Sequence, residues 1–182
     1  MSQEPSCEGA TMRNDAPTDP IARKLQEAAE RKKAEAEAAA GEKLLAADFA
    51  LAARKAGPEE MRRLREGLSQ RCESYNAQRP SGFTELRHIP SGRVDAGKYA
   101  IRVDAIEGLK EFQLRVTVGL HPNAAQFMVE PPDITPVVWN LRAEADESSF
   151  FWRDLHTGAK KINQEIIAEA FEALSDLLVA DA

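Results

Sequence analysis

The sequence has few of the features that mark an exported or membrane-spanning chain. It has two cysteines, Cys7 and Cys72, in 182 residues, and a pair so placed gives neither a metal-binding spacing nor a disulfide framework. Its apolar runs are only a few residues long, whereas a membrane-spanning helix needs roughly 20. The first eighteen residues hold one basic residue, Arg13, and no apolar segment, unlike a secretory or transit peptide. We therefore expect a cytoplasmic protein that does not enter a membrane.

Motifs for common enzyme chemistry are also lacking. No series of spaced glycines leads from a strand into a helix, so there is no phosphate loop or dinucleotide fingerprint. There is no Gly-x-Ser-x-Gly elbow of a serine hydrolase. None of the three histidines, His88, His121 and His156, lies three or four residues from another, as a helical metal pair requires. We expect no cofactor and no bound metal, and the sequence favours a protein that is not an enzyme without deciding the point.

The charge of the chain is uneven along its length. The net charge is −6. Residues 19–79 are close to balanced, with 13 Lys and Arg against 11 Asp and Glu, whereas residues 80–182 hold 10 against 16. An acidic region repels phosphate groups. We therefore do not expect a nucleic-acid partner, and binding through the arginines near residues 62–71 ranks last among the functions considered.

A long charged helix is predicted for the first part of the chain. Asp19 and Pro20 are a typical helix start, and residues 21–56 are dominated by strong helix formers. Gly57 and Pro58 then predict a break, because proline lacks a backbone donor and clashes with the preceding turn. A second helix follows, with one apolar stripe made of Met61, Leu64, Leu68, Cys72 and Tyr75. Residues 19–79 thus form a helical arm or a hairpin after a disordered tail, residues 1–18.

After Pro80 the side-chain pattern changes from helical to alternating. Residues 99–103 and 112–120 alternate apolar and polar side chains, which predicts a hairpin with one buried face. Shorter strands are predicted near residues 86–89, 127–129, 137–141 and 150–154. An amphipathic helix follows over residues 163–179, with Asn163 as its expected cap. The fold class is therefore α+β: a long N-terminal helical arm or hairpin, then an antiparallel meander of about four to six strands packed by a C-terminal helix over residues 80–182.

Two apolar surfaces favour a non-catalytic interaction or adaptor protein. The stripe from Met61 to Tyr75 must be covered by the sheet, by the first helix or by a second copy of the chain. On the last strand, Phe151 must point away from Phe150 and Trp152, so one set of aromatic side chains lies on the outer face. The interaction residues that we predict are Leu64, Leu68, Tyr75 and Trp152. The expected partner is another protein or a second copy, with the arm as a possible coiled-coil contact.

The alternative is a small-molecule-binding domain or an enzyme. Its pocket would lie between the sheet and the C-terminal helix. The polar side chains predicted to line it are Arg102, Arg115, Asp154 and His156. A solid apolar interface between sheet and helix would exclude this alternative, whereas inward polar side chains around a cavity would support it.

Overall fold

The computed structural model describes residues 19–108, 110–124 and 134–180. It confirms the α+β class, with seven strands between two helices. The elements are α1 (Pro20–Gln78), β1 (Arg87–Ile89), β2 (Arg93–Ala96), β3 (Tyr99–Glu107), β4 (Phe112–Leu120), β5 (Val137–Ala145), β6 (Phe150–Asp154), β7 (Lys160–Lys161) and α2 (Asn163–Ala180). The predicted tail, residues 1–18, and the predicted strand at 127–129 lie outside the described residues.

The predicted break at Gly57 and Pro58 is wrong, because α1 runs through both residues. The buried residues around Pro58 are spaced four apart: Ala53 and Gly57 lie before it and Met61 lies after it. The apolar stripe then continues at the same helical phase, so one unbroken helix buries it from Ala53 to Cys72. This burial outweighs the cost of about 3 kcal/mol that a proline brings to a helix interior. Of the two arrangements left open, arm or hairpin, the structure has the single helix.

The seven strands form one antiparallel meander. They lie side by side in chain order from β1 to β7, and each strand pairs with the next in antiparallel register. The register places Ile101 opposite Val118 and Val116 opposite Trp139. Because side chains alternate along each strand, these apolar residues all point to the same face. Apart from residues 121–136 between β4 and β5, consecutive strands are joined by at most five residues, which makes this order the simplest one for the chain.

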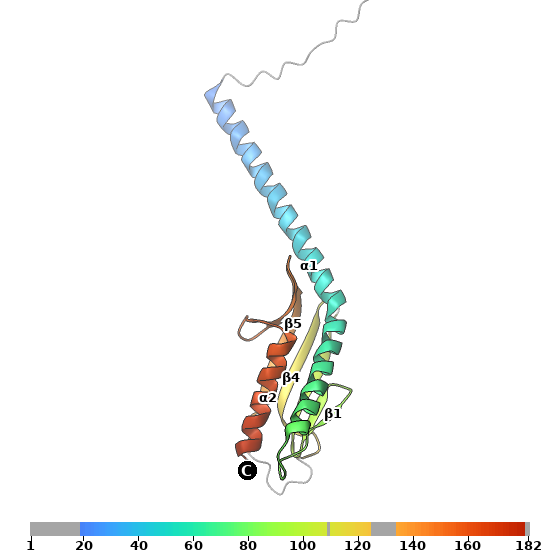
Figure 1. The fold of residues 1–182 in the computed structure, drawn as a ribbon. Coiled ribbons are helices and arrows are strands. Elements are labelled where there is room, and N and C mark those ends of the chain that lie inside the picture. Colours follow the sequence, from blue (N-terminus) through green and yellow to red (C-terminus); the bar gives the residue numbers. More distant parts are fainter. Residues whose placement is uncertain (1–18, 109, 125–133, 181–182) are drawn as a thin grey trace, which may run out of the picture. The chain divides into compact units, whose positions relative to one another are not determined.

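One face of the sheet is covered by both helices. Residues 46–78 of α1 and the whole of α2 lie beside each other on this face, shown in green and red in Figure 1. Leu64 and Leu68 of α1 and Leu174 of α2 are at most 1% exposed and share a core with the sheet. The two helices approach closely where Gly67 of α1 meets the Ile167 side chain. We call the opposite side of the sheet, which neither helix covers, the open face. Ala100 and Thr117 on it are nevertheless buried, and Pro136 lies against Gly119 there.

The contacts divide the chain into two units, and the division falls inside α1 after Leu45. In the first unit the described part of the helix is stabilised by ion pairs four residues apart, such as Arg23 with Glu27 and Arg31 with Glu35. Its larger apolar side chains, including Ile21 and Leu25, are exposed. Among the described residues, neither helix is apolar enough over a sufficient length to span a bilayer.

Candidate interaction surface

The predicted interaction residues lie mostly inside the core. Leu64, Leu68 and Trp152 are at most 1% exposed. Tyr75 is half-buried, and its hydroxyl donates to the carbonyl of Thr84 at 3.2 Å. The stripe of α1 is therefore covered by the sheet and α2 of the same chain. These four residues stabilise the fold and do not offer an exposed surface.

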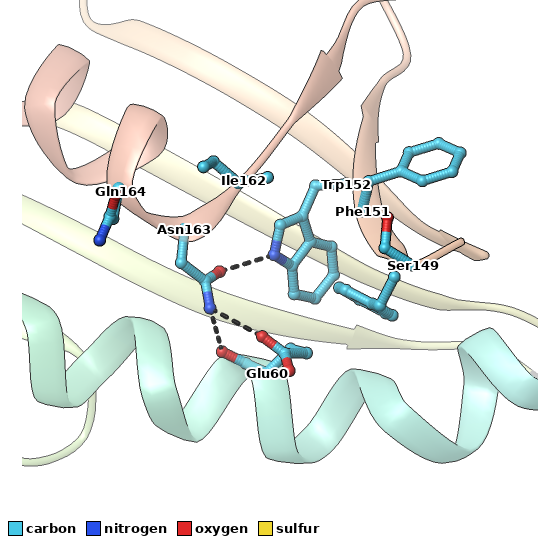
Figure 2. A pocket seen from close by; sticks show the side chains of 8 residues that line it. Glu60, Ser149, Phe151, Trp152, Ile162, Asn163 and Gln164 are labelled. Carbon is cyan, nitrogen blue, oxygen red and sulfur yellow. Dashed lines mark hydrogen bonds between the residues drawn. The ribbon is translucent and has the colours of Figure 1, made fainter. Parts of the chain in front are cut away.

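Trp152 and Asn163 belong to a polar link that joins α1, β6 and α2 (Figure 2). The indole Nε1 of Trp152 donates to Asn163 Oδ1 at 2.8 Å. The Asn163 amide then donates to the backbone carbonyl and the carboxylate of Glu60, at 3.1 and 3.0 Å. The side chain of Asn163 is therefore not the helix cap that the sequence predicts. Glu165 in the first turn instead reaches back as the N3 residue of a capping box does, because its carboxylate accepts the N–H of Ile162 at 2.9 Å.

The structure does not gather the four predicted pocket residues. Arg102 and Arg115 are on the open face, away from α2. Asp154 is buried at the end of β6, where its carboxylate accepts the N–H groups of His156 and Thr157. Burial acts to raise the pKa of Asp154, but these hydrogen bonds outweigh it and the pKa is lowered. His156 is exposed in the turn that Asp154 holds together.

A shallow hollow of about 360 Å³ lies beside the start of β6. Figure 2 shows the side chains around it. Its lining residues are Glu60, Ser149, Phe150, Phe151, Trp152, Ile162, Asn163 and Gln164. The Glu60 carboxylate already accepts hydrogen bonds from Asn163 and from Arg63. None of the four predicted pocket residues lines the hollow, and nothing in it is arranged for acid–base chemistry.

Other reactive groups of the described residues are likewise apart. No group of three or more histidine, cysteine, aspartate and glutamate side chains in the described ranges could hold a metal ion. Burial, with a smaller effect of Glu73, raises the pKa of the Cys72 thiol to about 11. A thiol with that pKa stays protonated near neutral pH and is a poor nucleophile.

The open face concentrates the basic residues of the sheet. The strand register assigns to it seven basic and three acidic side chains among the described residues, and two flanking carboxylates, Glu111 and Asp146, pair with its Arg142 and Lys160. The basic ones are Arg87, Arg93, Arg102, Arg115, Arg142, Arg153 and Lys160, and the acidic ones are Asp95, Asp104 and Glu144. The open face is thus positive, although residues 80–182 are acidic as a whole. This separation of charge attracts negatively charged groups to the open face.

Several of these basic residues lie directly opposite one another. Arg93 is opposite Arg102, and Arg153 lies between Arg142 and Lys160. Like charges in opposing positions destabilise a sheet. Carboxylates offset part of this repulsion, because Glu144 pairs with Arg142 and with Arg153 at 2.6 and 3.0 Å. Arg93 is paired in the same way with Asp95 at 2.8 Å.

Among the described residues, Arg102 and Arg115 are left without an ion pair, although exposed Asp104 lies opposite Arg115 in the strand register. Within the described ranges neither guanidinium forms an ion pair, and Arg115 makes one hydrogen bond, from Nε to Asn140 Oδ1 at 3.2 Å. Arg102 is half-buried and Arg115 is exposed. The two are diagonal neighbours on β3 and β4, since Arg102 lies opposite Thr117. A guanidinium can bind a carboxylate with two parallel hydrogen bonds. The pair can therefore bind two carboxylates held side by side.

Phe151 is the aromatic side chain on the open face, and it is only 6% exposed. The Arg153 guanidinium lies 5.0 Å and the Lys160 ammonium 4.2 Å from its ring centre. Lys160 is held by Asp146 at 2.7 Å. The opposite orientation of Phe151 and Trp152 is as predicted, and two cations cover the outer ring.

Exposed aliphatic side chains lie next to the two unpaired arginines. Val138 is opposite Thr117 on the open face and is 43% exposed. Leu155 is 45% exposed, and its N–H donates to the Asn140 carbonyl at 2.9 Å, which continues the β5–β6 register by one residue. Val138 thus lies two strands from Arg102 in one cross-strand row, across Thr117, and Leu155 lies two strands from Arg115 in another, across Asn140. We call these four residues the arginine–aliphatic patch.

Comparison of the chain with protein families, with curated proteins and with solved structures returned no match. The site therefore rests on the residues alone. The arginine–aliphatic patch was missed in the sequence because Arg102 and Arg115 were assigned to a pocket under α2. The alternation on β3 and β4 contains the missing signal, since it places both arginines on the polar side of their strands.

Proposed function

We propose that this is a non-catalytic interaction protein that holds an acidic protein partner against the open face of its sheet. The observation that carries the proposal is the pair Arg102 and Arg115, two guanidinium groups without carboxylate partners among the described residues of a face that is already positive. The two helices close the other face, so they fix the sheet as a rigid platform. Binding on a rigid platform costs little ordering of the backbone.

The arrangement of opposing basic residues supports this reading. A sheet that served only its own stability would gain from alternating charges across strands. Here Arg93 faces Arg102 and Arg142 faces Arg153. Departures from the local rules of stability are expected where a surface has a function. An acidic partner would relieve the repulsion, and this gain would contribute to binding.

Retention on immobilised polyglutamate tests the proposal. A chain of net charge −6 is repelled by a polyanion unless a positive face is presented to it. We expect the full chain to be retained at low salt and released as salt rises. Arg102→Glu combined with Arg115→Glu should abolish retention. A matched control reverses the charge of two exposed basic residues of α1, by Arg54→Glu with Lys55→Glu. This control should be retained as the unmodified chain is.

Two results would overturn the proposal. One is passage of the unmodified chain through the column at low salt. The other is an equal loss of retention in the α1 control, because the interaction would then depend on total charge and not on the open face. Circular dichroism of each variant confirms that the fold is kept.

A further inference from the structure

The arginine–aliphatic patch offers two kinds of contact in adjoining positions. The cationic part is Arg102 and Arg115 on β3 and β4. The aliphatic part is Val138 on β5 and Leu155 beyond β6, both more than two-fifths exposed. Thr117 joins the two parts, because it lies opposite Arg102 on one side and Val138 on the other. A purely acidic partner would use the first part and leave the second exposed to water.

We infer that the partner segment is amphipathic, with carboxylates that bind Arg102 and Arg115 and aliphatic side chains that cover Val138 and Leu155. The inference rests on the proposed function, since it concerns the same face. Burial of aliphatic surface adds affinity that does not weaken with salt, whereas the arginine contacts set orientation and association rate. The combination makes the surface selective against partners that are only acidic.

The face fits a protein segment better than a nucleic acid. Proteins that bind single strands on a sheet stack the bases on exposed aromatic rings. On the described part of the open face the aromatic ring is Phe151, which Arg153 and Lys160 cover. Aliphatic Val138 and Leu155 offer nothing to a phosphate.

Fluorescence anisotropy with three labelled probes tests the inference on the full chain. The first probe is a short peptide that alternates glutamate and leucine. The second has serine in place of each leucine, and the third is an oligouridine. We expect the glutamate–leucine peptide to bind most tightly. Val138→Ser with Leu155→Ser should lower the affinity for this peptide about tenfold. This is the loss expected when aliphatic burial worth about 1.4 kcal/mol is removed. The same change should leave the glutamate–serine peptide unaffected.

The possible outcomes separate this inference from the proposed function. Equal affinity for the two peptides, with no effect of the serine variants, would overturn the amphipathic partner and leave the acidic one. Failure of both peptides to bind would overturn both. Tighter binding of oligouridine than of either peptide, lost in Arg102→Glu with Arg115→Glu, would replace the protein partner by a nucleic acid. In every case the α1 control, Arg54→Glu with Lys55→Glu, should bind as the unmodified chain does.

Discussion

Asn163 shows how much of a single residue's role depends on distant parts of the chain. The sequence predicts a helix cap, because asparagine is favoured there. In the structure its side chain joins Trp152 to Glu60, a residue 103 positions away. Local patterns describe neighbours within a few residues, so they could not reveal this link. They did predict that Phe151 and Trp152 point to opposite faces, because alternation on a strand is a local property, but not that Trp152 is the one in the core.

The Asn163 link predicts a specific stability effect. Asn163→Ala removes the acceptor of the Trp152 indole N–H in a buried position, and should lower the free energy of unfolding by about 1–3 kcal/mol. In a Trp152→Phe background the indole donor is already gone, so the same substitution should cost clearly less. Urea denaturation of the four proteins measures the difference. Equal costs in both backgrounds would show that the hydrogen bond contributes nothing.

At the scale of elements, the alternating pattern was the most informative signal. It predicted β3, β4 and β6 and the hairpin between β3 and β4, because one face of each strand is apolar. The helix α1 was predicted with a false break, since Gly57 and Pro58 were judged by their own propensities. The spacing of buried residues across them would have shown one continuous stripe. The two-residue strand β7 has no such pattern, because two residues are too few to show a period.

Two glycines of α1 provide a matched test of this packing. A Cβ atom at Gly57 would lie 2.5 Å from a ring carbon of Phe112, whereas one at Gly41 would meet nothing within 4 Å. Gly57→Ala should therefore destabilise the protein by about 1–3 kcal/mol through overpacking. Gly41→Ala should favour its helix by about 1 kcal/mol. Urea denaturation measures the first effect and helical circular dichroism the second. A stability gain at Gly57 would show that α1 does not pack on β4 as described.

For the whole molecule, composition was a poor guide to the surface. The acidic balance of residues 80–182 argued against a positive surface, but the fold places seven of their basic side chains on one face with five acidic ones, counting Glu111 and Asp146. The helix α2, by contrast, has acidic residues and no basic ones. Total charge hides such a separation, because it depends on which strands become neighbours. Register, and not composition, therefore determines where the basic side chains gather.

The most direct measurement is an NMR titration of the isotope-labelled chain with the glutamate–leucine peptide. If the open face is the docking surface, the largest shift changes should lie in β3, β4 and β5 around Arg102, Arg115 and Val138. The core-facing residues of α2 should change little. Shift changes concentrated on α1 or α2, with β3 and β4 unaffected, would contradict the account.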